Sequence, residues 1–263
     1  MNAKPLDQCT VLVTAGASGI GHAIASAFHA AGSRVWVCDI DADALDRAVA
    51  GLPGLMAATT DVSDPEAVDQ LLATIRADGH GLDVLVNNAG IAGPTAAVED
   101  IRTEDWRATL AVDMDGAFFC ARAAVPLLKA NGGGSLVNMA SNAGLFGFPY
   151  RLPYAMCKWA MIGMTKTLAM ELGPAGIRVN ALCPGSVNGP RIEGVIERDA
   201  RQQGVSADDI RQLYQRQSSL RTFVDAGDIA AMAVFLASPA GARISGQAIA
   251  LDGHTESLSN LTD

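Results

Sequence analysis

The sequence predicts an α/β fold, a doubly wound parallel sheet with helices on both faces. Short β-branched runs alternate with longer stretches of helical apolar spacing along the whole chain, which is the pattern of repeated βαβ units. Apolar residues make up 49% of the 263 residues and aromatic residues only 5%, as expected for a large aliphatic core. No composition shift, linker or internal repeat divides the chain, so we expect one domain over residues 1–263.

The predicted strands are short and apolar. Right-handed crossovers make such strands parallel, so their carboxyl ends should lie at one edge of the sheet, where ligands of open α/β sheets bind. We expect seven strands, at residues 11–14, 34–38, 55–59, 82–87, 135–139, 177–183 and 247–251.

Helical periodicity fills the segments between the strands, at residues 21–31, 65–78, 106–129 and 154–172, with a further helix starting near Asp41. One connection, residues 184–246, is far longer than a single crossover helix requires. We assign its crossover helix to residues 225–237 and treat residues 189–224 as a helical insertion. This insertion, the lid, should cover the carboxyl ends of the strands.

The composition counts against several classes of function. The net charge of -9 argues against nucleic acid or an anionic membrane as a partner. No apolar run reaches the roughly 18 residues of a membrane span, and the polar first residues have no secretory signal character, so we expect a cytoplasmic protein. Five scattered cysteines and four histidines without metal-ligand spacing predict neither a disulfide framework nor a metal site.

Residues 14–21, Thr-Ala-Gly-Ala-Ser-Gly-Ile-Gly, join the first strand to the first helix. Glycine lets the backbone approach a pyrophosphate, and the helix N-terminus supplies free N–H groups. An acidic residue at the end of the second strand, Asp39, completes the dinucleotide-binding pattern. Its carboxylate would accept hydrogen bonds from ribose hydroxyls and repel a 2′-phosphate, so NAD is favoured over NADP. The alternative is that Asp39 merely caps the helix starting near Asp41.

A second group of polar residues lies in residues 138–158. Tyr154 and Lys158 are four residues apart and follow Pro153, which suits the first turn of a helix, so both side chains should share one face. A free tyrosine ionises near pH ~10, and a neighbouring cation favours the phenolate. Together with the hydroxyl of Ser141, this arrangement predicts a proton-transfer site.

These motifs, in this order, resemble the short-chain dehydrogenase/reductase family over essentially the whole chain. The matching pieces are residues 14–21, Asp61-Val62 after the third strand, residues 87–90 after the fourth, Ser141, Tyr154, Lys158 and Pro184-Gly185. The resemblance implies a Rossmann-type sheet of seven strands. It also implies a homotetramer, with the long helices near residues 106–129 and 154–172 packing between subunits.

The resemblance also implies roles. Tyr154 would be the general base, Lys158 would favour its phenolate and hold the nicotinamide ribose, and Ser141 would hydrogen-bond the substrate oxygen. Asp113 would support the lysine. The residues that the resemblance assigns to NAD are Gly16, Ser18, Gly19, Ile20, Gly21, Asp39, Ile40, Asp61, Val62, Asn88, Ala89, Gly90, Tyr154, Lys158, Pro184, Gly185 and Val187.

The chain departs from the family pattern at three positions. Ala15 stands where the first glycine of the turn is expected. Asp113 replaces the usual asparagine, and we hypothesise that its negative charge shifts the pH optimum. Gly189 stands where a threonine commonly contacts the nicotinamide carboxamide, so that contact must come from elsewhere, such as the backbone of Val187.

Substrate specificity should lie in the lid and in the loop before Tyr154. Residues 191–221 contain six arginines and five acids, and most of these arginines are expected to form solvated pairs on helix faces. Arg151 and Arg191 lie close to the site in sequence. We hypothesise that one of them binds an anionic or polyhydroxylated substrate, with surface pairing as the alternative.

The prediction is therefore an NAD-dependent dehydrogenase of a secondary alcohol or sugar hydroxyl. One alternative is reduction of a 3-oxoacyl carrier-protein thioester, against which Asp39 and the acidic composition count. A second alternative, a nucleotide-binding regulator without turnover, has no chemical need for Ser141, Tyr154 and Lys158.

Overall fold

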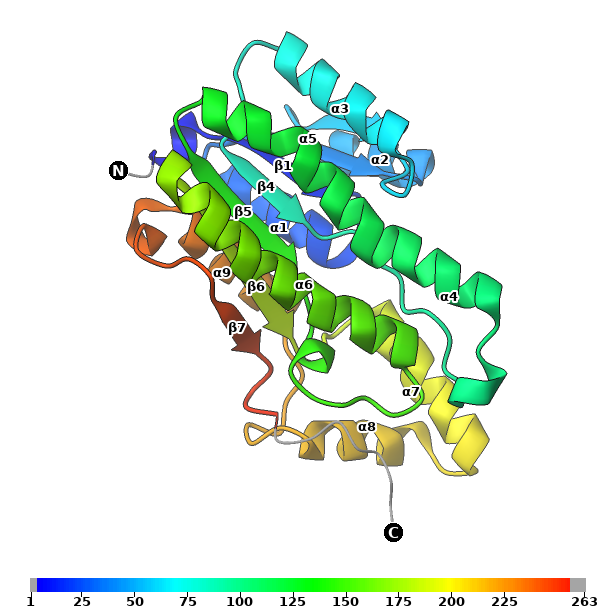
Figure 1. The fold of residues 1–263 in the computed structure, drawn as a ribbon. Coiled ribbons are helices and arrows are strands. Elements are labelled where there is room, and N and C mark those ends of the chain that lie inside the picture. The colour runs from blue at the N-terminus through cyan, green and yellow to red at the C-terminus, as the bar shows by residue number, and fades with distance from the viewer. Residues whose placement is uncertain (1–3, 256–263) are drawn as a thin grey trace.

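A seven-stranded, all-parallel sheet forms the centre of the fold in the computed structural model, which describes residues 4–255. The strand order is β3-β2-β1-β4-β5-β6-β7 (Figure 1). The order reverses between β1 and β4, which is the switch point where ligands of such sheets bind. The bounds are β1 Thr10–Thr14, β2 Arg34–Asp39, β3 Met56–Thr59, β4 Val84–Asn87, β5 Gly134–Met139, β6 Ile177–Pro184 and β7 Ala248–Leu251.

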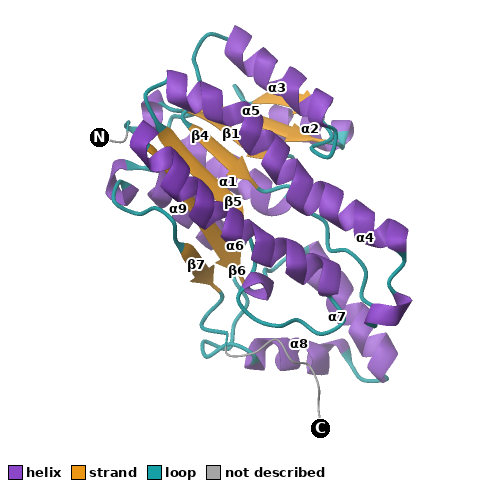
Figure 2. Ribbon diagram, in the orientation of Figure 1, coloured by secondary structure: helices purple, strands orange, loops and turns teal. Residues whose placement is uncertain are grey.

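Helices cover both faces of the sheet (Figures 1 and 2). One apolar core lies under α1 Gly19–Ala30, α2 Ala42–Gly51 and α9 Ala226–Ala237. The opposite face packs against α3 Pro65–Ala77, α5 Gly116–Ala130 and α6 Leu152–Leu172. Strands β1 and β4 are buried along their full length, as expected where a parallel sheet is covered on both sides. The predicted doubly wound fold is confirmed.

The helix predicted over residues 106–129 is interrupted. Helix α4 Thr103–Leu110 passes into a π-helical turn, Ala111–Asp115, before α5 begins. A π turn holds one residue more than an α-helical turn and is common at functional sites. Apolar spacing continues through this turn, so the sequence pattern did not show it.

The lid is helical, as predicted. It contains α7 Pro190–Gln203 and α8 Ala207–Arg216, and α9 follows as the crossover helix. The lid has a small apolar cluster of its own, separate from the cores of the sheet. Its members are Ile196, Ala200, Ile210, Tyr214 and Phe223.

The remaining helical segments are single 3₁₀ turns, at Leu6–Gln8, Val98–Asp100, Asn142–Gly144, Gly173–Ala175 and Pro239–Gly241. None of the helices within residues 4–255 is long and apolar enough to cross a membrane.

Candidate active site

Strand β5 delivers Ser141 to the carboxyl edge of the sheet. The residue is 8% exposed, and its Oγ accepts a hydrogen bond from the amide of Ala143 at 3.1 Å. The same oxygen donates to Oδ1 of Asn142 at 3.3 Å. These two contacts hold the hydroxyl at the start of the 3₁₀ turn Asn142–Gly144.

Helix α6 places a phenol and an ammonium together. Tyr154 lies in its first turn with Pro153, and Lys158 follows one turn later. The Nζ atom of Lys158 is 5.3 Å from the centroid of the Tyr154 ring. Lys158 is only 4% exposed, so little water screens its charge from the phenol.

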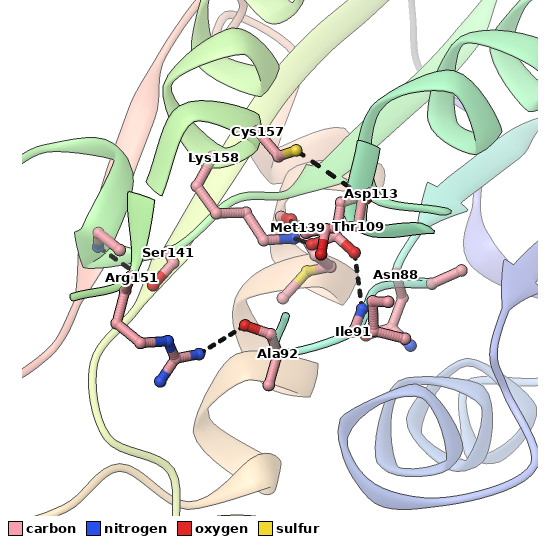
Figure 3. Close-up of polar contacts among 12 residues, drawn as sticks. Asn88, Ile91, Ala92, Thr109, Asp113, Met139, Ser141, Arg151, Cys157 and Lys158 are labelled. Carbon is pink, nitrogen blue, oxygen red and sulfur yellow. Dashed lines mark hydrogen bonds and ion pairs between the residues drawn. The ribbon is translucent and has the colours of Figure 1, made fainter. Parts of the chain in front are cut away.

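Two further groups hold the lysine (Figure 3). Nζ donates to the carbonyl of Met139 at 3.2 Å and lies 3.2 Å from Oδ2 of Asp113. Oδ2 has no aligned hydrogen-bond donor, so the contact with Lys158 is ionic. The other carboxylate oxygen, Oδ1, accepts from the amide of Ile91 at 2.6 Å. The π-helical turn aims Asp113, which is fully buried, at this point.

Gly90 lies against this ion pair. A Cβ atom at this position would lie 3.2 Å from both the Asp113 Oδ2 and the Lys158 Nζ atoms. The absence of a side chain therefore lets the backbone after β4 pass beside the charged pair.

The glycine-rich turn packs tightly against the protein at two of its glycines and has free space at a third. A Cβ at Gly21 would lie 2.1 Å from the Ala15 carbonyl oxygen, and one at Gly16 would lie 2.6 Å from the Val37 side chain. Gly19 has a φ of +54° and nothing within 4 Å of its Cβ direction. Ala15 itself has a φ of +48°, so it adopts the left-handed conformation that glycine takes freely.

Asn88 holds this turn from the neighbouring strand β4. Its amide nitrogen Nδ2 donates to the carbonyls of Thr14 and Ala15, at 3.0 and 3.1 Å. The backbone amides of Asn88 and Ala89 both donate to Oγ1 of Thr14 at 2.9 Å. The altered turn thus keeps its shape through contacts across the switch point.

The first helix is left open at its N-terminus. Ser18 is the N-cap of α1 but makes no side-chain capping bond, so the first N–H groups of α1 remain free for an anion. In contrast, Asp41 caps α2 by accepting from the amide of Ala44 at 2.9 Å. The helix-capping role considered for Asp39 therefore belongs to Asp41. Asp39 accepts from the amide of Ala17 through Oδ2 and from the amide of Asp41 through Oδ1, both at 3.3 Å.

The other residues assigned to the nucleotide lie along the same edge. Ile40 is 72% exposed beside Asp39. Asp61 accepts from the amide and hydroxyl of Ser63, and Val62 is buried against Gly116. These residues surround an open turn and a free helix end, and this arrangement fits a dinucleotide with an adenosine half near Asp39.

The base of the lid lies after β6. The amide of Gly185 donates to the carbonyl of Leu251, and Val187 forms a parallel bridge with Val224. That bridge uses the carbonyl of Ser186 and the amide of Asn188. The backbone groups of Val187 therefore point to the other side of the bridge. Gly189, with a φ of +143°, is the N-cap of α7.

The two arginines proposed for substrate lie in different places. Arg151 is half-buried, and its Nη2 donates to the carbonyl of Ala92 at 2.7 Å (Figure 3). Its guanidinium carbon is 5.2 Å from the centroid of the Tyr154 ring. Arg191 is exposed in the first turn of α7.

The expected pairing of the lid arginines is wrong for most of them. Among the described residues, only Arg211 of the lid has a carboxylate within ion-pair distance, that of Glu193. Two of the acids are engaged elsewhere, because Asp199 accepts from the Tyr214 hydroxyl and Asp209 caps with Ser206. The sequence spacing allowed these ion pairs, but the two carboxylates form a helix cap and a tyrosine hydrogen bond instead.

Sequence reasoning also missed the segment after β7. Ser218 of the lid forms an antiparallel bridge with Thr255, and Oγ1 of Thr255 accepts from Nδ2 of Asn142 at 3.4 Å. Ser219 Oγ lies 2.7 Å from Nδ1 of His254. These residues connect the end of the lid to the loop of Ser141. No local motif could have indicated a contact between positions 142 and 255.

Cys157 lies inside the catalytic helix but is not a nucleophile. It is 1% exposed, and burial raises the pKa of its thiol to about 11, with a smaller contribution from the charge of Asp113. A thiol in such surroundings stays protonated and unreactive.

Comparisons with known proteins agree with this geometry. The family model described as "Enoyl-(Acyl carrier protein) reductase" matches residues 14–254. A D-beta-hydroxybutyrate dehydrogenase of Rhizobium meliloti is 31% identical over 251 residues, which cover 93% of this chain and 97% of the relative. A D-threitol dehydrogenase of Mycolicibacterium smegmatis is 35% identical over 261 residues, covering 94% and 93%.

A solved structure is also similar. The crystal structure of an NAD⁺-bound xylitol dehydrogenase superposes with a TM-score of 0.90 at 28% identity, and the match covers 94% of this chain and 99% of that one. Fold, motifs and relatives thus agree over nearly the full length. The chain belongs to the short-chain dehydrogenase/reductase family and is an oxidoreductase that acts on CH-OH groups.

Proposed function

We propose that this protein is an NAD-dependent dehydrogenase of a secondary alcohol, with Tyr154 as the general base. The observation that carries the proposal is the pairing of the Tyr154 ring with the buried ammonium of Lys158. Hydroxybutyrate, threitol and xylitol, the substrates in the names of similar enzymes, all carry a secondary hydroxyl.

The chain's own residues would perform the proton chemistry. Ser141 orients the substrate hydroxyl toward the phenol oxygen of Tyr154. Tyr154, beside the ammonium of Lys158, accepts the hydroxyl proton as the C–H bond breaks. Bound NAD supplies the hydride acceptor. Ser141 and Tyr154 then hold the new carbonyl oxygen.

Several residues would hold the cofactor. The free N–H groups of α1 suit the pyrophosphate, and Asp39 suits the hydroxyls of the adenosine ribose. Lys158 would hold the nicotinamide ribose, and the backbone of Val187 would meet the carboxamide. NAD rather than NADP follows from the carboxylate of Asp39, which would repel a 2′-phosphate.

The assembly proposed with this function is a homotetramer built on α5 and α6. These helices leave large apolar side chains exposed, with Phe118 at 50%, Met156 at 47% and Trp159 at 53%. Large apolar side chains exposed on both helices support an interface at this face.

A spectroscopic assay tests the function. Purified protein is mixed with NAD or NADP and a panel of 3-hydroxybutyrate, threitol and xylitol, and the absorbance of reduced nicotinamide is followed. We expect turnover with NAD and its loss in Tyr154→Phe. A preference for NADP with 3-oxoacyl thioesters would favour the carrier-protein reductase instead. NAD binding without turnover of any alcohol would indicate a regulator.

A further inference from the structure

Arg151 has an incomplete set of partners. Its guanidinium lies between two rings, 5.3 Å from the centroid of Phe148 and 5.2 Å from that of Tyr154. Nη2 donates to the Ala92 carbonyl, but the Nε–H is buried and has no acceptor. A charged donor that is buried without an acceptor is costly, so this N–H is placed to bind an acceptor on a ligand.

No carboxylate within residues 4–255 pairs with this cation. Arg151 has no ion pair among residues 4–255, and the charges that act on it from the lid are the arginines Arg191 and Arg198. Burial lowers the pKa of the Arg151 guanidinium, and these two arginines lower it further, while Tyr154 and Tyr214 oppose the shift. Both lid arginines also lack a carboxylate partner among the described residues.

The surroundings of Arg151 contrast with the acidic total of the chain. The chain carries a net charge of -9, and yet the guanidinium over the Tyr154 ring has no ion pair among residues 4–255. Arg191 and Arg198 of α7 are exposed and add positive charge that acts on it. A cation that lies beside a reacting group without a counterion favours an anionic ligand.

We propose that Arg151 binds a carboxylate of the substrate, and that Arg191 and Arg198 strengthen the attraction from the lid. The substrate is then a secondary alcohol that carries a carboxylate, rather than a neutral polyol. The planar fork of a guanidinium matches the two oxygens of a carboxylate. Because the guanidinium lies over the ring of Tyr154, a bound carboxylate holds the substrate beside the phenol. This inference rests on the proposed dehydrogenase function and specifies its substrate class.

Matched pairs of substrates test it. Lactate, 3-hydroxybutyrate and 4-hydroxypentanoate differ in the distance between hydroxyl and carboxylate, and each is compared with its uncharged primary amide. We expect kcat/KM for the best acid to exceed that for its amide by about 10- to 100-fold, the value of a charged hydrogen bond.

Arg151→Gln should abolish this selectivity, and Arg151→Lys should retain part of it. Glutamine can still donate to the Ala92 carbonyl, which keeps the loop in place. The variant removes a cation from beside Tyr154 as well, so activity on both substrates falls, and the acid-to-amide ratio is the informative readout. The matched control is Arg201→Gln, which replaces an exposed arginine of α7, the lid helix that also carries Arg191 and Arg198. It should leave the acid-to-amide ratio unchanged.

Equal losses on acid and amide in Arg151→Gln would overturn the inference, as would a wild-type ratio near one. If no alcohol is oxidised, the proposed function fails. Carboxylate binding is then measured independently, by the thermal unfolding of the protein in the presence of NADH. A larger rise in melting temperature with butyrate than with butyramide, lost in Arg151→Gln, would still support the carboxylate site. Equal shifts would reject it.

Discussion

Ala15 shows how a single methyl group is accommodated in the cofactor turn. Its φ of +48° lies in the left-handed region, which costs an L-residue roughly 1–2 kcal/mol. Hydrogen bonds from Asn88 to Thr14 and Ala15 hold the turn in spite of that cost. The strain is therefore local and is offset by contacts from strand β4.

Replacing this alanine with glycine should stabilise the protein. Ala15→Gly relieves the strain but gives the unfolded chain more freedom, so the expected gain is at most about 1 kcal/mol. Thermal unfolding without cofactor measures it. Ala17→Gly, in the same turn but without a positive φ, is the control and should destabilise. A lower melting temperature for Ala15→Gly would show that the methyl group contributes packing that outweighs the strain.

Asp113 places a buried negative charge next to the proton-transfer pair. Its carboxylate is 3.2 Å from Lys158 Nζ, so it offsets part of the positive charge that the ammonium presents to the Tyr154 ring. The hypothesis drawn from the sequence is that this negative charge shifts the pH optimum.

Asp113→Asn tests this effect, because asparagine can still accept from the Ile91 amide through Oδ1. If the hypothesis holds, the pH dependence of kcat/KM differs between the parent and Asp113→Asn. Asp115→Asn, in the same π-helical turn, controls for general charge effects. Superimposable profiles for the parent and Asp113→Asn would refute the hypothesis.

At the level of elements, the lid is the least integrated part of the fold. Helices α7 and α8 pack around their own cluster, whereas α6 contributes to the cores over the sheet. Elements with few links to the main core open with less free energy than the whole protein needs to unfold. The lid can thus move as a unit over the carboxyl edge.

Hydrogen exchange should show this difference. In the free protein, amides of α7 and α8 should exchange at least about tenfold faster than those of the α6 interior, because local opening suffices. NADH together with a carboxylate such as butyrate should slow the lid, while α6 changes little. Identical protection of α6 and the lid helices would contradict the idea of a separately moving lid.

On the scale of the whole molecule, the apolar faces of α5 and α6 bear on assembly. Trp159→Glu introduces a charge at the centre of the proposed tetramer interface and should dissociate it, because an unpaired charge is costly to bury. Sedimentation equilibrium measures the mass. Glu171→Gln, near the end of the same helix, is the control. A parent protein that sediments as a monomer would rule out the tetramer.

Much of the fold follows from local patterns. Each predicted strand appears in the sheet. Most of them contain runs of Val, Ile or Leu, whereas β3 reads Met-Ala-Ala-Thr. The π-helical turn was missed because Asp113 and its neighbours keep ordinary helical spacing. The acidic residues of the lid were predicted to pair with arginines, but Asp199 and Asp209 form hydrogen bonds with other residues. The sequence alone does not show which of several possible contacts a carboxylate makes.

The residues of the site also differ in how well the sequence predicts their contacts. Tyr154 and Lys158 were predictable because their spacing within one helix fixes their relation. The unpaired Nε–H of Arg151 was not, because it depends on Ala92 and Phe148 from other segments. Contacts between residues that are far apart in the chain leave no periodic signal in the sequence.

The bridge between Ser218 and Thr255, with Thr255 in turn touching Asn142, offers a handle for engineering. Residues 252–255 are more than 90 positions from Tyr154 in the chain, but they link the last turn of the lid to the loop that carries Ser141. Libraries intended to change substrate range can therefore vary this short stretch without altering the proton-transfer residues. A bulky fusion partner attached close behind it would be expected to hinder lid closure, which makes the opposite end of the chain the safer place for a purification tag.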